Sequence, residues 1–170
     1  MAGVVFDISQ SPEVARWLNQ GLDHAVKRAM VATAARLVNH IQTEVIPNAQ
    51  PQPVDRGLYK ASWKFGKTDD GAEVWNSASY AAIIEYGARA AKIKPGRLMI
   101  DALTAWVRRK GIAQNTVEAR QIAFAIAFSM KKKGIFNGGK GLRILEKSLG
   151  RLHEFLSKEF AVEHKREFKT

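Results

Sequence analysis

Apolar residues recur at steps of three and four positions through the first part of the chain, the spacing of one face of an α-helix. Ser11-Pro12-Glu13 precedes them with a serine cap, a proline that needs no N–H partner, and an acid near the positive end of the helix dipole. Pro47, Pro51 and Pro53 prevent the helix from continuing. The pattern predicts a long helix over 11–46, with an apolar face made by Val14, Leu18, Leu22, Ala25, Ala29, Leu37, Ile41 and Val45.

The period changes to two after the prolines. Between Leu58 and Phe65, Ala61 and Trp63 alternate with lysine and serine, which is typical of a strand. Asp69-Asp70-Gly71 predicts a turn, and Ala72 to Asn76 predicts the partner strand. A β-hairpin over 56–78 is only marginally stable alone. We therefore expect it to lie on the long helix, to pair with a neighbouring chain, or both.

Helical patterns return after the hairpin, over 79–133. A short helix is predicted to close at Gly87, and a second one, with the stripe Leu98, Ala102, Leu103 and Trp106, to end at Gly111. Asn115 has capping-box spacing to Glu118 and predicts the start of a third. Ile122, Phe124, Ile126 and Phe128 alternate with alanine and also fit a strand, but the alanine content and the cap favour a helix.

A glycine-rich loop over 134–141 and a helix over 142–167 complete the pattern. The last helix is predicted to be amphipathic, with the stripe Leu142, Leu145, Leu149, Leu152, Leu156 and Phe160. The elements together predict one α+β domain over 1–170: a long N-terminal helix, a small antiparallel hairpin, and several C-terminal helices packed against it. The length of 170 residues suits one domain.

Composition narrows the function classes. The chain has no cysteine, which excludes disulfides, thiol nucleophiles and cysteine-built zinc sites. No stretch approaches the roughly 20 apolar residues of a membrane span. The first residues, MAGVVFDISQSPE, lack the basic and apolar regions of a signal peptide. We expect a soluble protein that is not exported by that route and has no membrane partner.

Positive charge is concentrated in the second part of the chain. The whole chain has 27 Lys and Arg against 16 Asp and Glu, a net charge of +11. Residues 1–91 carry nine of each sign, so the entire surplus lies in 92–170. Such asymmetry suggests an anionic partner, although helix C-termini also favour basic residues locally. The candidate contacts to DNA or to an acidic partner are Arg108, Arg109, Lys110, Lys131, Lys132, Lys133, Lys140 and Arg143.

The sequence offers no catalytic or metal-binding pattern. His24, His40, His153 and His164 have no ligand spacing, and no pair of acids stands out as an acid–base couple. Residues 134–141 match the GxxxxGK part of a phosphate-binding loop. However, Gly141 replaces the Ser or Thr that would hold magnesium, and the loop follows a helix rather than a strand. We therefore expect no catalytic residue, no cofactor and no enzyme activity.

The central segment carries a motif pattern of a known family. Arg56-Gly57-Leu58-Tyr59-Lys60-Ala61-Ser62, a hairpin, and Ser79-Tyr80-Ala81-Ala82-Ile83-Ile84-Glu85-Tyr86-Gly87 resemble the head–tail joining family of tailed bacteriophages, the neck or tail-completion proteins. The carried-over motif positions are Gly57, Leu58, Ser62, Tyr80, Glu85, Tyr86 and Gly87. The chain departs from the family where it has Asn137-Gly138-Gly139-Lys140-Gly141 in place of a proline-rich segment before the last helix.

The resemblance implies a non-enzymatic structural protein in the neck of the virion, present in the host cytoplasm during assembly. It implies a ring of identical subunits around the DNA channel, with six-fold or twelve-fold symmetry. The other implied partners are portal or adaptor proteins, tail terminator or tail-tube proteins, and packaged DNA in non-specific contact. A sequence-independent nucleic-acid-binding module that uses the basic second half is the alternative function.

Several residues allow two interpretations. Trp63, Phe65 and Trp75 either fill the core of one subunit or offer apolar faces to neighbours. We expect Tyr80 to be a packing residue and Gly87 to end a helix with positive φ. Glu85 is expected to bond a neighbouring backbone group or an arginine, for which Arg89 and Arg97 are the candidates.

Overall fold

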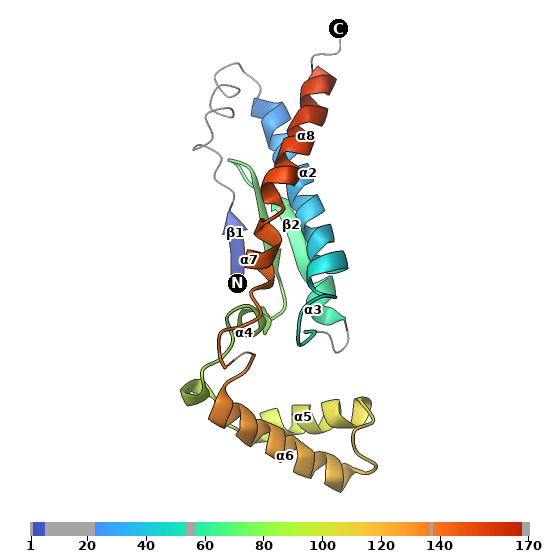
Figure 1. Cartoon of the computed structure of the whole chain (residues 1–170), viewed down its shortest axis with the longest axis vertical. Helices are drawn as coiled ribbons and strands as arrows, with labels where there is room; N and C mark the ends of the chain where they lie inside the picture. Colours follow the sequence, from blue (N-terminus) through green and yellow to red (C-terminus); the bar gives the residue numbers. More distant parts are fainter. Residues whose placement is uncertain (1, 6–22, 54–56, 137, 168–170) are drawn as a thin grey trace. The chain divides into compact units, whose positions relative to one another are not determined.

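In the computed structural model, which describes residues 2–5, 23–53, 57–136 and 138–167, the chain forms two units (Figure 1). Unit 1 combines the described residues up to Ala81 with those from Ile144 onward, and unit 2 consists of Ala82–Arg143. The chain leaves unit 1, builds unit 2, and then returns to complete unit 1. The predicted α+β class, mostly helical, is confirmed. That 1–170 behaves as one domain stays a prediction.

The first long helix of unit 1 is α2 (Asp23–His40), which continues into a π-helical turn, η1 (Ile41–Val45). Its predicted start at Ser11-Pro12-Glu13 lies outside the described residues. Its predicted end is confirmed, because η1 ends at Val45. The Ile46 N–H donates to the Ile41 carbonyl at 3.0 Å, and Pro47 has no N–H to donate next in the series.

A three-stranded antiparallel sheet lies against α2. It consists of β1 (Ala2–Val5), β2 (Trp63–Lys67) and β3 (Ala72–Asn76) in the order β1-β3-β2. The predicted hairpin is β2–β3, in which Phe65 pairs with Val74. The sequence prediction missed β1, because four residues are too few to show a period of two. α2 packs on both hairpin strands and buries Ala72 and Val74 completely, so the hairpin gains the support that it needs.

The predicted strand over Leu58–Phe65 is wrong in its first half. Residues Leu58–Ala61 form one helical turn, α3, and the strand begins only at Trp63. The N–H groups of Ala61 and Ser62 donate to the carbonyls of Gly57 and Leu58, both at 2.9 Å. Alternation over so few residues does not separate a helical turn from a strand.

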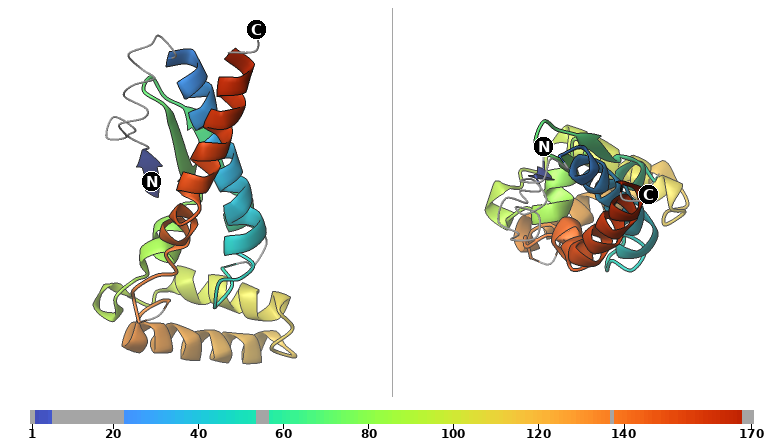
Figure 2. Two further views of the ribbon diagram at one scale, coloured as in Figure 1. Left: turned by 45° about the horizontal axis from the view of Figure 1, so that its top comes forward. Right: turned by 90° about the horizontal axis from the view of Figure 1, so that it is seen from above.

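The end of the chain forms two helices instead of the single helix predicted over 142–167. These are α7 (Ile144–Leu149) and α8 (Leu152–Glu167), with Gly150 between them. Gly150 lowers helix propensity at that position, and the two helices separate there. α8 runs beside α2 in the opposite direction, as Figure 2 shows from two further sides.

The face that α8 turns toward α2 contains acids. Phe155, Glu159 and Glu163, spaced by four residues, are its buried positions, whereas the predicted stripe of Leu152, Leu156 and Phe160 is only half-buried. On α2, Arg28 pairs with Glu163 at 2.7 Å and Arg36 pairs with Glu159. Each buried carboxylate thus has an arginine partner whose side chain is about half exposed, which explains how acids fit on this face.

Unit 2 contains most of α4 (Ala81–Tyr86), the 3-10 turn η2 (Ala90–Lys92), α5 (Arg97–Arg109) and α6 (Thr116–Lys133). α5 and α6 pack as an antiparallel pair. Ala119, Ala123 and Ala127 are fully buried, and the last two form a core cluster with Ile100 of α5. The helix prediction for 122–128 is confirmed, since these residues lie within α6. Small residues at every fourth position let the two helices approach closely.

The predicted ends of α5 and α6 are confirmed. Gly111, at φ +65°, follows α5, and the N–H groups of Gly111 and Ile112 donate to the carbonyls of Arg108 and Val107, both at 3.1 Å. At the start of α6, the Glu118 N–H donates to Asn115 Oδ1 at 2.9 Å, and Glu118 Oε2 accepts from the Gln114 N–H at 2.8 Å.

The predicted apolar stripe of α5 is wrong at its first positions. Leu98 is 87% exposed and Ala102 is exposed, whereas Ile100 and Val107 are the buried residues. Met99 and Leu103 pack with Ile100, so Leu103 is the member of the predicted stripe that stays in the packed face.

Candidate assembly surfaces

The first half of the motif pattern forms the junction between α3 and β2. Gly57 has φ +74° and open space around its Cα, so the backbone conformation alone requires glycine. Leu58 is exposed, whereas the neighbouring Tyr59 is buried and packs edge-on against Trp63 at 5.9 Å between ring centroids. The Ser62 carbonyl accepts from the Ser77 N–H at 2.9 Å, which closes the base of the hairpin.

The hairpin aromatics have different environments. Trp63 is buried and belongs to the core of unit 1, while Phe65 is exposed on β2. Trp75, half-buried, lies on the opposite face of the sheet, where its ring would be 3.1 Å from a Cβ on Gly66. Of the three, Phe65 and Trp75 retain surface that a neighbouring subunit could cover.

The second half of the motif pattern forms α4 and divides into buried and exposed positions. Ala81, Ile84 and Glu85 are buried. Ile83 and Tyr86, one helical turn apart, are 42% and 61% exposed; we call these two residues the α4 stripe. Tyr80, which precedes α4, packs on Tyr59 with 6.5 Å between ring centroids and keeps an exposed edge.

Gly87 ends α4 as predicted, with φ +69° and its N–H donating to the Ile83 carbonyl at 2.8 Å. A Cβ at this position would lie 2.5 Å from the carbonyl carbon of Gly139 and 2.6 Å from the nitrogen of Gly141. The glycine-rich loop therefore presses backbone to backbone against the end of α4. Sequence inspection predicted the positive φ of Gly87 but not this close approach.

The same loop caps α4 in place of a further helical turn. The Leu142 N–H donates to the Ile84 carbonyl at 2.8 Å, and the Arg143 N–H donates to the Glu85 carbonyl at 3.2 Å. The Glu85 side chain is 3% exposed. Its expected bond to Arg89 or Arg97 stays a prediction; Arg97 lies 3.7 Å from Asp101, measured between Nε and Oδ2.

The loop that matched part of a phosphate-binding motif directs its N–H groups inward. Those of Gly139, Lys140 and Gly141 all point to the Phe136 carbonyl, at 2.9, 3.1 and 3.3 Å. A phosphate-binding loop needs such groups to face its ligand. This arrangement agrees with the interpretation of the segment as a glycine loop.

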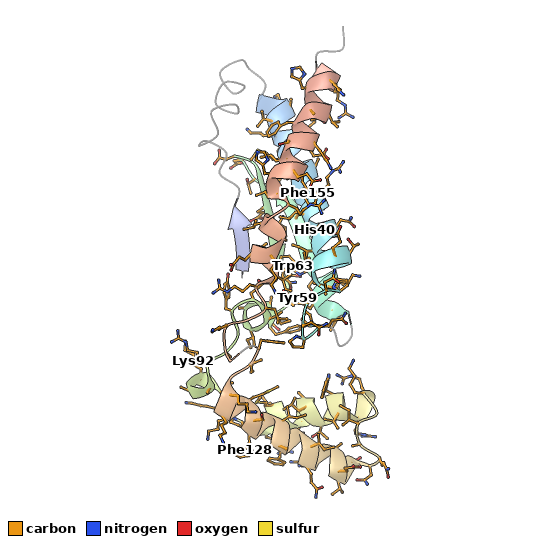
Figure 3. The ribbon with its side chains drawn as sticks, viewed as in Figure 1. His40, Tyr59, Trp63, Lys92, Phe128 and Phe155 are labelled. Atoms are coloured by element: carbon orange, nitrogen blue, oxygen red, sulfur yellow. The ribbon has the colours of Figure 1, made fainter. Side chains whose placement is uncertain are left out.

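A second exposed apolar face lies on α6. Val117, Phe124 and Phe128 lie on the side of the helix opposite the buried alanines, and Phe128 is 57% exposed. Figure 3 shows Phe128 on the side of α6 away from α5. The Arg120 guanidinium lies over the Phe124 ring, 5.9 Å from its centroid. We call Val117, Phe124 and Phe128 the α6 stripe.

The structure separates the predicted basic residues into two groups. Arg108, Arg109 and Lys110 lie where α5 ends, beside the start of α6. Lys131, Lys132 and Lys133 lie at the other end of α6, roughly 25 Å away for a helix of this length. Lys140 is on the glycine loop that follows them, and Arg143 is at the start of the return to unit 1.

The sequence screen missed two further cations. η2 packs against α6, and Ala88 forms a β-bridge with Ile135, so Arg89 and Lys92 come to the same end of α6 as Lys131–Lys133. The signal was the run Arg89 to Lys94, which has three basic residues and no acid.

Histidines and acids in the described part of the chain do not form a cluster of metal ligands. No group of three or more His, Asp or Glu side chains there could hold a metal ion. His40 is buried, with its ring edge-on to Phe155 at 5.6 Å and its Nδ1 3.3 Å from Glu44. Among the described residues, no helix is long and apolar enough to cross a membrane.

An exposed ion-pair network at the start of α8 shifts two pKa values. Arg151 donates from Nε to Glu154 at 2.6 Å, and Lys158 donates to the same carboxylate at 2.6 Å. The hydrogen bond from Arg151, followed by that from Lys158, lowers the pKa of Glu154 to about 2. The hydrogen bond to Glu154 raises the pKa of Arg151.

This network gives a pH prediction. A carboxylate whose pKa is depressed on folding adds stability above its unfolded pKa, near 4.5, and that stability is lost as the pH falls toward 2. We expect Arg151→Gln to raise the pKa of Glu154 toward 4.5, as measured by NMR titration of its carboxyl carbon. An unchanged midpoint for Glu154 in this variant would show that Arg151 does not hold the carboxylate.

Comparison with family models identifies the central part of this architecture. Residues 13–87 match the family described as "Bacteriophage HK97-gp10, putative tail-component". This region of the chain is similar to the HK97-gp10-like family of phage tail components. The resemblance to head–tail joining proteins is thereby confirmed, and the chain carries a structural component of the bacteriophage virion. No curated protein and no solved structure matches it.

The matched HK97-gp10-like region contains α2, the hairpin and α4, and it ends at Gly87, where α4 stops. The α4 stripe is therefore inside the family region. The α6 stripe and both basic groups of unit 2 lie outside it.

Proposed function

We propose that this chain joins the DNA-filled head to the tail, as a neck or tail-completion protein that assembles into a ring around the DNA channel. The match of residues 13–87 to a phage tail-component family carries this proposal. The proposed partners are further copies of the chain in a six-fold or twelve-fold ring, portal or adaptor proteins, and tail terminator or tail-tube proteins. Its role is structural and not enzymatic, in the neck of the virion after assembly in the host cytoplasm.

The pattern of burial within the motif supports an assembly role. Packing accounts for Ala81, Ile84 and Gly87, which are buried or in close backbone contact. It does not account for Ile83 and Tyr86, two large apolar side chains that face outward on a helix of only six residues. Aromatic residues are enriched where protein surfaces meet. We therefore assign the α4 stripe to the contact between neighbouring subunits.

A head-to-tail contact of this kind favours a ring. The α4 stripe of one subunit would meet a different surface of the next, and such heterologous contacts close into a ring when the rotation between subunits permits. Phe65 and Trp75 on the hairpin and the α6 stripe are further apolar surfaces that the described residues offer for this contact.

The double variant Ile83→Ser/Tyr86→Ser tests this assignment. We expect it to fold but to lose the concentration-dependent ring, as measured by mass photometry and sedimentation velocity, and to stop joining purified heads to tails. Val162→Ser is the matched control, because Val162 is also an exposed apolar residue, on α8, outside the α4 stripe.

Two results would contradict the proposal. One is a wild-type chain that forms no ring with itself or with heads and tails and never enters a joined particle. The other is an equal loss of assembly in the α4 double variant and in Val162→Ser, which would show that exposed apolar area in general, and not the α4 stripe, drives association.

A further inference from the structure

Nearly all of the positive charge of the chain lies in unit 2. Residues 82–143 contain thirteen Lys and Arg against three Asp and Glu, a net charge of +10 out of +11 for the chain. The rest of the chain is therefore close to neutral. The HK97-gp10-like match ends at residue 87, so the family region does not account for this charge.

Unit 2 contains three acids. Two of them have partners elsewhere in the unit, and the third is buried. Asp101 pairs with Arg97 at 3.7 Å and with Arg120 at 3.5 Å. Glu118 caps the start of α6. The Glu85 side chain is buried. Asp101 and Glu118 therefore lie in parts of unit 2 other than the C-terminal end of α6, and the cations of the unit outnumber its acids by ten.

Three segments bring cations together at that end. The last turn of α6 supplies Lys131, Lys132 and Lys133. η2, which packs beside α6, follows Arg89 and ends at Lys92, labelled in Figure 3. The glycine loop folds back on the same place, because a Cβ on Gly139 would lie 3.1 Å from the Cα of Arg89. Lys140 follows directly on this loop. The lysine-rich end consists of the exposed residues Arg89, Lys92, Lys131, Lys132, Lys133 and Lys140.

Their number exceeds what the helix itself needs. The C-terminus of a helix carries roughly half a negative charge, and one or two basic residues in the last turn complement it. The lysine-rich end has six cations, three of them from outside α6. None of the six forms an ion pair with a carboxylate in the described part of the chain.

We propose that the lysine-rich end of unit 2 binds the phosphate backbone of duplex DNA without reading its sequence. Five of its six cations are lysines, which contact phosphates as mobile point charges. Lysine is depleted at protein–protein interfaces, where arginine and aromatic residues are enriched, so an acidic protein is the weaker match. This inference rests on the proposed function to the extent that a ring around the channel would place DNA within reach.

The two basic groups of unit 2 provide a matched experiment. Binding of the full-length protein to a fluorescent 30-base-pair duplex is measured by anisotropy between about 0.05 and 0.3 M salt. We expect Lys131→Ala/Lys132→Ala/Lys133→Ala to weaken binding by about tenfold or more near 0.1 M salt and to reduce the slope of log K against log salt by about 2 to 3. Arg108→Ala/Arg109→Ala/Lys110→Ala removes the same charge at the other end of α6 and should change the slope by less than about 1.

Several outcomes overturn the proposal. A failure of the wild-type protein to bind the duplex at 0.05 M salt would overturn it. Equal weakening of binding by the two triple variants would also overturn it, because that result indicates an effect of net charge alone. Competition by poly-L-glutamate as strong as that by unlabelled duplex at equal charge would indicate an acidic protein partner instead. Thermal unfolding by circular dichroism confirms that both variants fold.

The same variants separate this inference from the proposed function. If the lysine variant still forms rings and joins heads to tails but has lost DNA binding, the DNA contact and the assembly role are independent and both stand. If wild-type protein assembles but does not bind DNA, only the DNA inference fails. If it binds DNA through the lysine-rich end but never assembles, only the proposed function fails.

Discussion

Replacing Gly141 by alanine is expected to lower the free energy of unfolding by about 3 kcal/mol. Gly141 has φ +78°, a conformation that costs a residue with a side chain about 1–2 kcal/mol. In addition, the new Cβ would overlap the carbonyl oxygen of Glu85, which is backbone and cannot rotate away. Forcing extra atoms into a packed site costs about 1–3 kcal/mol. Urea denaturation of the full-length chain measures the sum.

Gly111→Ala is the matched control for this prediction. Gly111 is also in unit 2, at φ +65°, but nothing lies within 4 Å of the added Cβ. It should therefore cost only the conformational part, about 1 kcal/mol. Hydrogen exchange adds a local measure, because Gly141→Ala should expose the Leu142 amide, which now donates to the Ile84 carbonyl. Equal destabilisation by the two variants would contradict the close approach of the loop to α4.

The second large effect is expected at the α2–α8 interface. Arg36→Ala should destabilise the chain by about 2 kcal/mol, because Arg36 is the cation described beside Glu159, whose side chain is only 9% exposed. Breaking a fully buried pair costs about 3–5 kcal/mol, but the Arg36 side chain is half exposed and part of the interaction is screened by water. Thermal or urea unfolding is the measurement.

Arg166→Ala provides the comparison. Arg166 also pairs with a buried glutamate of α8, Glu163, at 3.0 Å, but Glu163 keeps Arg28 as a second partner. We expect a cost below about 1 kcal/mol. Adding Glu159→Gln to Arg36→Ala should recover part of the lost stability, since the unpaired buried charge is removed. If Arg36→Ala and Arg166→Ala lower the free energy of unfolding equally, the unpaired carboxylate of Glu159 is not the cause of the loss.

The elements that the sequence predicted well are those with a local physical signal. Pro47 removes an N–H and ends the first helix, Asn115 caps α6 with its own side chain, and Gly111 adopts the positive φ that closes α5. Each of these effects acts over a few neighbouring residues, so the pattern alone contains it. In α6, the alanine content and the Asn115 cap are local signals as well, and they correctly favoured a helix over the strand that the alternating large residues also fit.

The elements that it predicted poorly depend on distant parts of the chain. Leu58 to Ala61 form a turn of helix in which Tyr59 is buried against Trp63 and Tyr80, contacts that the alternation of residues does not contain. The acids on α8 are buried because arginines more than 120 residues earlier meet them. A hydropathy pattern assigns glutamate to the surface, so it predicts that the leucine stripe of α8, and not the glutamates, is buried.

The candidate surfaces show the same division. The motif segments could be recognised from their residues and order, and Gly87 could be assigned a positive φ. Which motif residues face outward required the structure, as did the separation of the basic residues to opposite ends of α6. Arg89 and Lys92 join the lysine-rich end only because η2 folds back onto α6.

The return of the chain to unit 1 has a consequence for its synthesis. On the ribosome, α2 is complete about 110 residues before α8 begins, and the hairpin about 75 residues before it. α8 is the partner of α2 across the Arg28 and Arg36 contacts. Unit 2, which is continuous in sequence, can fold during that interval, whereas the apolar and arginine-bearing face of α2 must wait. A nascent chain stalled before residue 152 would thus present a half-built unit 1 to chaperones, and premature termination there would yield an aggregation-prone product.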